Sequence, residues 1–331
     1  MIIKSIKLTN FRNHTSYSLE CDDNTSLILG ENGCGKTSVL EAIYILTRGK
    51  SFRAVDSEIL KRGKEFYRVE LEYCDGKKNI AVYDGKSKTF LVSDKKTKRL
   101  PKNHKYPVVL FLPSDLNLIS HSPSRRRDYF DRFFSVLDDK YNDNLLKYEK
   151  ALKQRNELLK SDFFKKEMFF SWDLMLAKYG TKLFAARKSY NEEINSLLTK
   201  TYSSIAKNQD KIDIIYKTEV EKDSESYYLK MLDTGLEKDR CLKHTSFGVH
   251  RDDYLFEFNQ NLADGSASRG ETRSIVLALK FIEAKMIEKE LNLKPIILLD
   301  DVFSELDKNR RKSLVDNFKD NQIIITSVEN I

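Results

Sequence analysis

Hydrophobic and polar residues alternate with a short period in the first third of the chain. Runs with a period of two, or wholly apolar runs of about five residues, predict strands. The predicted strands are Ile2–Leu8, Thr25–Leu29, Arg68–Tyr73, Asn79–Tyr83, Thr89–Val92 and Pro107–Leu112. Turn pairs such as Asp75-Gly76 and Asp84-Gly85 separate several of them, as in antiparallel hairpins. Residues 1 to about 112 are therefore predicted to form a β-rich lobe.

The period changes to 3.6 from about Ser114 to Ala206, which predicts helices. Two apolar stripes have this spacing: Leu145, Tyr148, Leu152 and Leu159, and then Trp172, Leu176, Tyr179, Leu183, Tyr190, Ile194 and Leu197. They are too short for a long coiled-coil arm and indicate the core of a helical bundle. Residues 207–240 are polar and are expected to include a loop. Strands are predicted again at Thr245–Val249 and Tyr254–Asn259.

The last ninety residues combine one long helix with two apolar strands. The helix is predicted after Ser268, with its apolar positions at Ile275, Val276, Leu279, Ile282, Met286 and Ile287. Pro295–Leu299 is a short apolar run typical of a buried parallel strand. Gln322–Ser327 predicts a second such strand, whose polar tip is expected to face the same crevice.

The segment between the strand Leu27–Leu29 and the helix Ser38–Leu46 carries the most specific motif. It fits the pattern Gly, four residues, Gly-Lys-Ser/Thr in the strand–loop–helix context that this motif requires. The glycines let backbone N–H groups surround phosphate oxygens, Lys36 would reach the β- and γ-phosphates, and the Thr37 hydroxyl would bind Mg²⁺. A turn that binds nothing is the alternative, which the flanking strand and helix disfavour. The predicted nucleotide-binding residues are Gly30, Glu31, Asn32, Gly33, Cys34, Gly35, Lys36, Thr37 and Ser38.

Two adjacent aspartates, Asp300 and Asp301, follow the apolar run Pro295–Leu299. An acidic residue at the carboxyl end of such a strand is where Mg²⁺ beside a phosphate loop is usually held. We expect Asp300 to bind the metal together with Thr37, and Asp301 to polarise the attacking water. With Lys36 they form the predicted catalytic set. A turn or a helix cap is the alternative for the two aspartates.

Ser268 and Glu271 stand three residues apart at the start of the long helix. This is a capping box, which any helix can use. A capped helix N-terminus is also an anion site, so the two interpretations are compatible.

Charge and composition indicate the kind of partner. The 331 residues include 58 Lys and Arg against 50 Asp and Glu, which gives a formal net charge of +8. Such a balance indicates an anionic partner or a Lys-rich surface that keeps the protein in solution. Two basic clusters are candidate DNA contacts: Lys95, Lys96, Lys98 and Arg99 in one, and Arg125, Arg126 and Arg127 in the other. An exposed lysine-rich hairpin and a surface ion-pair network are the respective alternatives.

The four cysteines Cys21, Cys34, Cys74 and Cys241 have no metal-ligand spacing and form no dense framework. They indicate a reduced, cytosolic chain. The amino terminus lacks the apolar core of a signal peptide, and no run reaches the roughly 18 apolar residues that a membrane span needs. The cytoplasm is therefore the expected location.

Taken together, the motifs resemble the ABC-type ATPase heads of chromosome-maintenance proteins. The resemblance rests on the phosphate loop, a Ser-x-Gly-Glu signature far downstream, Asp300-Asp301, and Ser304-Glu305-Leu306-Asp307. In that class the signature helix of one subunit caps the γ-phosphate that another subunit binds. The resemblance thus implies that Ser268, Gly270 and Glu271 act in trans, and that Ser304, Glu305, Leu306 and Asp307 form the D-loop.

Within this class the chain is similar to the RecF family of bacterial recombination mediators. The matching stretches occur in the expected order over nearly the whole chain: Leu8–Asn13, Asn32–Thr37, Leu40–Tyr44, Gly49–Arg53, Phe111–Leu116, Pro123–Asp128, Gly248–Asp253 and Leu298–Asp307. The resemblance implies an α/β fold, with an ABC-type ATPase head and an inserted α-helical domain. The head combines a mixed sheet around the phosphate loop with an antiparallel β subdomain. It would comprise residues 1–113 and 241–331, and the helical insertion residues 114–240.

The resemblance also implies a function. Proteins of this family bind ATP and Mg²⁺, form ATP-dependent homodimers on DNA at gaps and single-strand/double-strand junctions, and hydrolyse ATP weakly, as a DNA-dependent switch. With RecR and RecO they help place RecA in gap repair, replication restart and SOS induction. This implies nucleoid-associated DNA binding in the cytoplasm and no membrane partner. The net positive charge independently favours sequence-independent contact with the DNA backbone.

Other classes compete with this interpretation. The nucleotide-binding subunit of an ABC-type transporter and another SMC-like ATPase share the phosphate loop. The long helical segment and the arginine cluster argue against a transporter subunit. A small-molecule kinase would act as a monomer and would not need the signature at Ser268. A nuclease with an ATPase head would require a further acidic cluster, which the sequence does not show.

Overall fold

The computed structural model describes residues 2–93, 95–161 and 165–328, which divide into two compact units. The first unit comprises Met1–Leu116 and Glu283–Ile331, and the second comprises Asn117–Ile282. The sequence predicts residues 241–282 as part of the ATPase head, whereas the structure assigns them to the second unit. The reason is that β10 (Asp253–Phe258) pairs along its whole length with β9 (Ile212–Lys217).

An antiparallel sheet of six strands forms one layer of the first unit, in the order β2-β1-β4-β5-β6-β7. Its strands are β1 (Ile3–Phe11), β2 (His14–Glu20), β4 (Tyr67–Tyr73), β5 (Lys78–Tyr83), β6 (Lys88–Val92) and β7 (Lys95–Thr97). Strict alternation of buried and half-buried residues in β4 gives the sheet one apolar face. The turns at Gly76 and Gly85 have the positive φ angles that the sequence signals predict.

A parallel sheet of four strands forms the second layer, in the order β3-β13-β12-β8. Its strands are β3 (Thr25–Leu29), β8 (Val108–Phe111), β12 (Ile296–Asp300) and β13 (Ile323–Ser327). Every residue of β8, β12 and β13 is buried, as expected for parallel strands with both faces covered. Asp300 pairs in register with Thr326, so polar residues of neighbouring strands meet at the carboxyl edge of the sheet.

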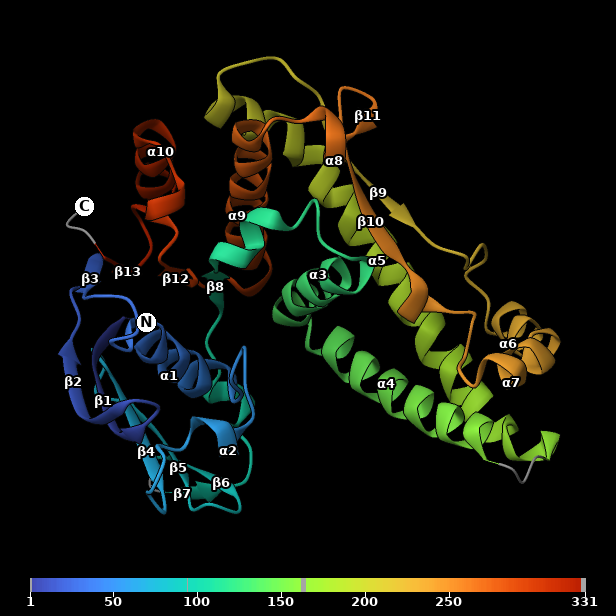
Figure 1. Cartoon of the computed structure of the whole chain (residues 1–331), viewed down its shortest axis with the longest axis horizontal. Helices are drawn as coiled ribbons and strands as arrows, with labels where there is room; N and C mark the ends of the chain where they lie inside the picture. Colours follow the sequence, from blue (N-terminus) through green and yellow to red (C-terminus); the bar gives the residue numbers. More distant parts are fainter. Residues whose placement is uncertain (1, 94, 162–164, 329–331) are drawn as a thin grey trace. The chain divides into compact units, whose positions relative to one another are not determined.

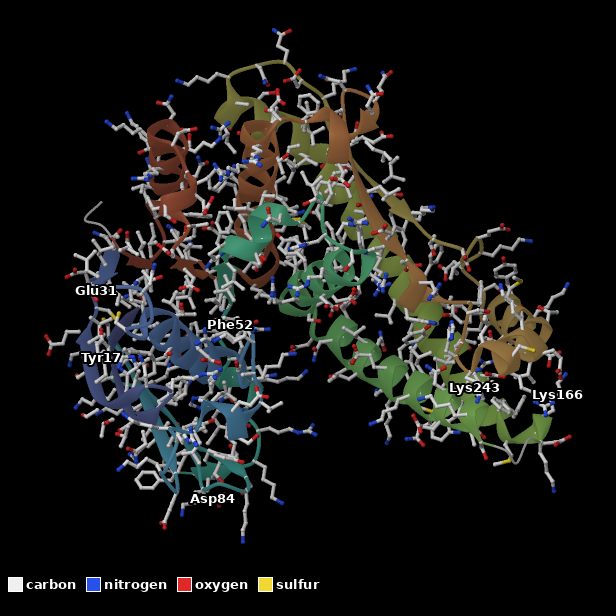
Figure 2. All side chains as sticks on the ribbon, in the orientation of Figure 1. Tyr17, Glu31, Phe52, Asp84, Lys166 and Lys243 are labelled. Atoms are coloured by element: carbon white, nitrogen blue, oxygen red, sulfur yellow. The ribbon has the colours of Figure 1, made fainter. Side chains whose placement is uncertain are left out.

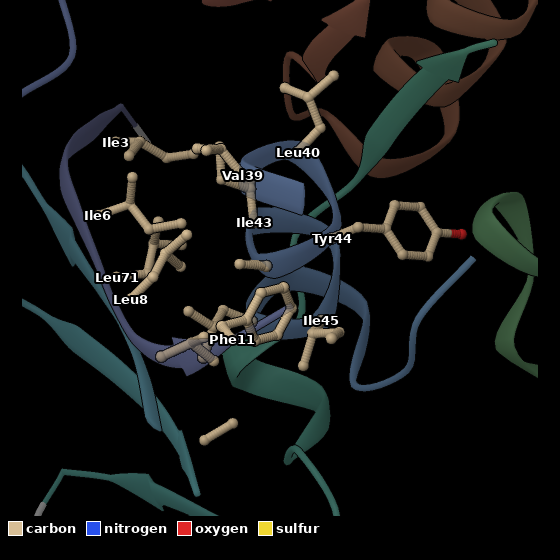
Figure 3. Packing of buried hydrophobic residues seen from close by; sticks show 14 of the residues in the cluster. Ile3, Ile6, Leu8, Phe11, Val39, Leu40, Ile43, Tyr44, Ile45 and Leu71 are labelled. Atoms are coloured by element: carbon tan, nitrogen blue, oxygen red, sulfur yellow. The ribbon is translucent and has the colours of Figure 1, made fainter. Parts of the chain in front are cut away.

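The helix α1 (Lys36–Arg48) packs against strands of both sheets and lies between them (Figure 1). Val39 and Ile43 on α1 face the side chains of Ile3, Ile6 and Leu8 on β1 (Figure 3). The same apolar cluster continues into β12 and β13. Each fully buried aliphatic side chain contributes about 1.5–3 kcal/mol to the stability of the folded protein. This core therefore fixes the start of α1 next to the parallel sheet.

Short elements complete the first unit: α2 (Asp56–Ile59), η1 (Lys102–His104), η2 (Pro113–Asn117), η5 (Phe303–Glu305) and α10 (Lys308–Phe318). The amide side chain of Gln322 connects the two sheets. Its Oε1 accepts from the N–H of Ile3 at 2.7 Å, and its Nε2 donates to the carbonyl oxygens of Ile3 and Asp22 at 2.7 and 3.0 Å. One side chain thus joins the amino-terminal end of β13 to β1.

The second unit is mainly helical. Its elements are α3 (Pro123–Leu137), α4 (Asp139–Lys160), η3 (Lys166–Met168), α5 (Phe170–Ala206), β9, α6 (Glu225–Thr234), α7 (Leu236–Leu242), η4 (Val249–Arg251), β10, β11 (Asn261–Leu262), α8 (Ala263–Ser266) and the start of α9 (Arg269–Leu291). The long helices α4 and α5 pack along each other (Figure 1). Lys166 and Lys243 both extend from the end of this unit that carries α6 and α7 (Figure 2).

A stripe of polar side chains on α5 covers the edge strand β9. Asn195 accepts from the N–H of Ile214 at 2.8 Å and donates to its carbonyl oxygen at 2.9 Å. Thr199 makes the same pair of bonds to Ile212 one turn later, at 3.1 and 3.0 Å. The exposed hydrogen-bonding edge of a strand is a template for unwanted pairing, and here the helix satisfies it.

Two buried arginines bind acidic residues inside the second unit. Arg155 pairs with Asp173 and Asp239 at 2.6 Å each, and Arg187 pairs with Asp131 and with Asp252. A buried charge is tolerated only when it is paired and hydrogen-bonded, and both arginines meet this condition.

One predicted strand is wrong. Thr245–Val249 forms no strand, because its backbone turns at Gly248, which has a φ of 130° and leads into η4. A Cβ at Gly248 would collide with the hydroxyls of Tyr148 and Tyr228, so this turn packs directly against two buried tyrosines. Among the described residues, no helix combines the length and the apolar character that crossing a bilayer requires.

Candidate functional site

The phosphate loop, residues 30–37, connects the end of β3 to the start of α1. Gly33 and Gly35 have φ angles of 84° and 105°, in the left-handed region that residues with a side chain avoid. Gly30 permits a close approach, because a Cβ there would lie 2.5 Å from Sγ of Cys34. Glu31 is exposed and points away from the unit (Figure 2). The loop thus presents backbone at a helix start, as a phosphate site requires.

Lys36, Thr37 and Asp300 come together at the carboxyl edge of the parallel sheet. Nζ of Lys36 donates to the carbonyl oxygens of Gly30 and Glu31 at 2.5 and 2.9 Å, so the ammonium group lies against the loop. The hydroxyl of Thr37 donates to Oδ1 of Asp300 at 2.8 Å. Residues 263 positions apart are thereby joined, in the arrangement that the sequence motifs predict.

Asp301 differs from Asp300 in its surroundings. Its Oδ1 is buried and has no hydrogen-bond partner within the described part of the chain. Burial raises the pKa of Asp301, Lys36 opposes this shift, and the neighbouring Asp300 adds to it. Asp301 also has a φ of 50°, a conformation that costs a residue with a side chain about 1 kcal/mol or more. An unpaired carboxylate near Lys36 is suited to orient a water molecule.

A cleft of about 530 Å³ opens from this edge. Its lining includes residues of the phosphate loop together with Asp300 and Asp301. It also includes residues that sequence reasoning did not assign to the site: Arg12, Asn13, Arg53, Glu58, Leu60 and Arg62. Three arginines in this lining favour an anionic ligand.

The turn between β1 and β2 supports the phosphate loop. Nδ2 of Asn13 donates to the carbonyl oxygen of Gly33 at 2.9 Å, and Nε2–H of His14 donates to that of Gly35 at 3.1 Å. A Cβ at Gly35 would collide with both side chains. These contacts hold the loop in place, and Asn13 also lines the cleft.

A buried carboxylate positions two of the cleft arginines. Glu41 on α1 is fully buried and accepts hydrogen bonds from Arg12 (2.8 and 2.9 Å), Arg53 (2.9 and 3.1 Å) and Ser51 (2.6 Å). Burial tends to raise the pKa of Glu41, but the bonds from Arg12, Arg53 and Ser51 outweigh it and lower the pKa. A sequence signal was available: Glu41 is the one acid in the apolar run Ser38–Leu46, and a buried acid requires a cationic partner.

The predicted signature residues lie in the second unit, at the start of α9. The capping box is formed: the N–H of Ser268 donates to Oε2 of Glu271 at 2.7 Å, and the N–H of Glu271 donates to Oγ of Ser268 at 3.3 Å. Gly270, in the first turn, accepts from the Ser274 hydroxyl at 3.1 Å. Ser268 is exposed, so its position is open to a ligand or a partner.

The D-loop residues lie in the first unit, directly after the aspartates. The hydroxyl of Ser304 donates to the carbonyl oxygen of Asp301 at 2.7 Å, which ties this loop to the site. Leu306 is buried, whereas Glu305 is exposed. Asp307 caps α10 by accepting from the N–H of Arg310 at 3.0 Å, and this backbone hydrogen bond lowers the pKa of Asp307.

The arginine cluster at the start of α3 is largely structural. Arg126 is buried, and its guanidinium binds both carboxylate oxygens of Asp253 at 2.7 and 2.8 Å. Arg127 is half-buried and donates to the carbonyl oxygen of Asp252 at 2.6 Å. The structure therefore contradicts the predicted DNA contact at Arg126, because a buried and paired guanidinium has no surface to offer a phosphate. Arg125 is exposed, and its DNA contact stays a prediction.

The second basic cluster is at the edge of the antiparallel sheet. Lys95, Lys96, Lys98 and Arg99, on and after the edge strand β7, are exposed and form no ion pair with a described residue. By contrast, Lys77 and Lys78 at the β4–β5 turn pair with Asp75 and Glu72 at 2.9 and 3.0 Å. Since no described residue pairs with these four cations, they are candidates for contact with an external anion. Lys residues also protect sheet edges from aggregation.

His250 makes its hydrogen bonds to residues of the second unit. Its Nδ1 accepts from the hydroxyl of Tyr148 at 2.8 Å, and its Nε2–H donates to the carbonyl oxygen of Thr245 at 2.9 Å. Burial lowers the pKa of His250 to about 4, so the ring is neutral at pH 7. With Asp252 and Asp253 bound to arginines, this segment stabilises the helical unit.

The fold and the site define an ABC-type ATPase head: a phosphate loop before a buried helix, a parallel sheet ending in paired aspartates, and an antiparallel β layer. The family model described as AAA ATPase domain matches residues 1–327. The head domain of Smc from Pyrococcus furiosus has the same fold, with a TM-score of 0.53 at 15% identity over 99% of this chain and 90% of that one.

Two further comparisons define the family within this class. The DNA replication and repair protein RecF of Lachnoclostridium phytofermentans is 33% identical over 98% of this chain and 92% of its own length. A solved structure of the recombination mediator protein RecF with ATP, from the RecFOR pathway, has a TM-score of 0.87 at 32% identity. It covers 99% of this chain and 92% of that chain. The chain belongs to the RecF family. Membership favours the predicted DNA-maintenance class over a transporter subunit or a small-molecule kinase.

Proposed function

We propose that this protein is an ATP-dependent DNA-binding recombination mediator of the RecF type, in which weak, DNA-dependent ATP hydrolysis acts as a switch. The observation that carries the proposal is the contact of Thr37 with Asp300 at 2.8 Å, beside Lys36 and the unpaired Asp301. It joins the phosphate loop to the aspartate pair in one cleft. Membership of an ATPase family supports the same chemistry.

The roles of the residues follow from their positions. Backbone N–H groups of the phosphate loop and Lys36 bind the β- and γ-phosphates. Asp301 lines the cleft near Lys36 and orients the attacking water. The Glu41-bound arginines Arg12 and Arg53 contribute positive charge to the lining of the cleft.

The residues present fit a magnesium ion. Oδ1 of Asp300 is occupied by hydroxyl hydrogen bonds, whereas Oδ2 receives none from the described residues. Mg²⁺ in nucleotide sites binds one or two protein oxygens together with phosphate oxygens and water. Thr37 and Asp300 are the proposed ligands, and the ion would neutralise charge on the β- and γ-phosphates.

Closure of the site requires a second copy of the chain. Ser268, Gly270 and Glu271 form a capped helix start, and such an N-terminus favours a negatively charged group. We assign these residues to the γ-phosphate of the other subunit's ATP. The D-loop Ser304–Asp307, tied to Asp301, belongs to the same interface.

DNA is the proposed anionic partner, bound through its backbone at gaps and single-strand/double-strand junctions. The net charge of +8 supports this assignment, and so do the cations at β7, which pair with no described residue. RecF of the RecFOR pathway is a structural neighbour, which supports RecR as a partner and RecO and RecA as later components. The protein would then act in gap repair, replication restart and SOS induction, at the nucleoid in the cytoplasm.

The test is to measure the size of the protein by light scattering with ATP, with ADP and with neither. We expect a dimer with ATP and a monomer in the other two states. Ser268→Arg places a bulky cation at the capped helix start and should remain monomeric with ATP. Asp301→Asn removes the group that orients water, so it should trap the ATP dimer and slow hydrolysis by about 10²-fold or more. If both variants dimerise and dissociate like the parent, the composite site is wrong.

A further inference from the structure

The hydroxyl of Thr326 connects the two aspartates of the site. Thr326 is fully buried at the carboxyl end of β13, in register with Asp300 on β12. Its Oγ1 lies 2.9 Å from Oδ1 of Asp300 and 3.0 Å from the backbone nitrogen of Asp301. Neither the phosphate-loop motif nor the aspartate motif includes this residue.

The chemistry of the groups fixes the direction of both hydrogen bonds. The N–H of Asp301 is a donor, so the Thr326 oxygen accepts from it. The one proton of the hydroxyl is then shared between Oδ1 of Asp300 at 2.9 Å and the carbonyl oxygen of Leu299 at 3.4 Å, and the shorter, charged contact is the stronger. Oδ1 of Asp300 therefore receives two hydroxyl protons, from Thr37 and from Thr326.

These two bonds leave the second carboxylate oxygen available. With Oδ1 held from two sides, the carboxylate cannot rotate freely, and Oδ2 keeps one orientation. A carboxylate fixed in this way loses less conformational freedom when it binds a metal ion.

Thr326 also supports the strained residue of the site. The backbone N–H of Asp301 donates both to Oγ1 and to the carbonyl oxygen of Thr326, at 3.0 and 3.1 Å. Asp301 has a left-handed φ of 50°, which persists only when its surroundings hold it. The same hydroxyl that orients Asp300 thus helps to hold Asp301.

We propose that Thr326 is a positioning residue of the ATP site, whose hydroxyl orients Asp300 toward the metal ion and holds Asp301 in the conformation used for hydrolysis. The inference rests on the proposed function, since it concerns the same site. Thr326 itself touches neither nucleotide nor water in this scheme.

The test compares Thr326→Val and Thr326→Ser with the parent protein. Valine keeps the shape of threonine without the hydroxyl, whereas serine keeps the hydroxyl without the methyl group. The first readout is the Mg²⁺ concentration at half-maximal binding of a fluorescent ATP analogue, and the second is kcat and KM for ATP. In Thr326→Val we expect the Mg²⁺ midpoint to rise and kcat to fall, each by about 10- to 100-fold. This is the range seen when residues that orient metal ligands are replaced. KM should change little, and Thr326→Ser should restore both values.

Thr47→Val is the matched control. Thr47 is also a fully buried threonine of the first unit, but its hydroxyl donates to the carbonyl oxygens of Ile43 and Tyr44 within α1, at 2.8 and 3.2 Å. This variant loses a hydroxyl on a residue that is as fully buried as Thr326, and it should leave both readouts unchanged. If Thr326→Val does not fold, Thr326→Ala removes the same hydroxyl with less crowding and serves in its place.

Three results would overturn the proposal: a parent-like Mg²⁺ midpoint and kcat in Thr326→Val, a serine variant that behaves like valine, or a control that shows the same losses. The last two would mean that packing matters rather than the hydroxyl. A parent protein that does not bind the ATP analogue at all would instead refute the proposed function.

Discussion

Glu41 is the residue whose environment best explains how arginines come to line the cleft. Its carboxylate is fully buried and binds two guanidiniums, one of which belongs to Arg12 with a left-handed φ of 54°. A further bond from Nη1 of Arg12 to the carbonyl oxygen of Glu58, at 3.0 Å, fixes the orientation of this side chain. The arginines are thus positioned before any ligand binds, which lowers the entropy cost of binding an anion.

Glu41→Gln should destabilise the protein by about 2 kcal/mol. Breaking a buried ion pair costs about 3–5 kcal/mol, and the partial exposure of Arg12 and Arg53 reduces the effect. Since the folded-state pKa of Glu41 is lowered, its stabilising contribution is complete above the unfolded pKa of about 4.3 and is lost as pH falls below it.

The measurement for Glu41→Gln is the urea midpoint of parent and variant between neutral pH and about pH 2. The gap between the two proteins should stay constant from neutral pH down to about pH 4.3 and should narrow below it, as Glu41 of the parent becomes protonated. A gap that does not narrow in the acidic part of this range would contradict an ionised Glu41. Ser57→Ala, at an exposed position of α2, is the control and should leave the midpoint unchanged.

Residue type and spacing predicted where some single residues lie and missed others. Lys36, Thr37 and Asp300 were predictable because a local motif constrains each of them, and the structure brings them together. Arg126 was not, because its partner Asp253 is 127 positions away in the chain and no local pattern distinguishes a paired arginine from a free one. Thr326 escaped assignment for the same reason: its role depends on the register of β13 with β12.

At the scale of elements, polar side chains of α5 bind the backbone of β9. Most helices cover a sheet with an apolar face, whereas α5 also satisfies the backbone of an edge strand through Asn195 and Thr199. This accounts for polar residues on a helix whose other face is buried against α4.

Asn195→Leu should therefore weaken the sheet at β9. The N–H of Ile214 loses its partner, and an unsatisfied backbone group costs about 1–3 kcal/mol. Amide hydrogens of β9 should exchange about tenfold faster for each 1.4 kcal/mol lost, as measured by hydrogen–deuterium exchange with mass spectrometry. Ser196→Ala is the control, because the Ser196 hydroxyl donates only to the carbonyl oxygen of Glu193 on the same helix. Equal exchange of β9 in both variants would show that α5 does not protect this edge.

Elements with a clear hydrophobic period could be predicted from the sequence. Elements that are stabilised by contacts with distant parts of the chain could not. The strands β3, β12 and β13 and the helix α9 lie where the hydrophobic pattern places them. The edge strands β2 and β7 were missed, since few of their residues are buried and their sequences carry little apolar alternation. The polar segment 207–240 contains β9, α6 and the start of α7, because partners elsewhere in the second unit stabilise them.

At the scale of the whole molecule, the cations at β7, which form no ion pair with a described residue, are the proposed contact between the ATPase head and DNA. Each Lys–phosphate contact releases counterions, so affinity for duplex DNA should fall steeply with salt and vary little with sequence. Lys95→Ala/Lys96→Ala should reduce the slope of log affinity against log salt by about 2, measured with the ATP-bound protein.

Lys77→Ala/Lys78→Ala removes the same charge from ion-paired positions of the same sheet and is the matched control. Its slope should stay close to that of the parent. An unchanged slope in the Lys95/Lys96 variant would exclude the β7 edge as a phosphate contact, and equal changes in both variants would indicate a general effect of net charge.

Gln322 and Thr326 give β13 a contact at each of its ends. The amide of Gln322 fastens the start of the strand to β1 through Ile3, whereas Thr326, at the opposite tip, touches the aspartates. Between these two residues the strand is hydrogen-bonded to β3 and to β12 along its length, which makes it stiff. The antiparallel layer and the aspartate pair are therefore coupled through one rigid central strand and not through a loop.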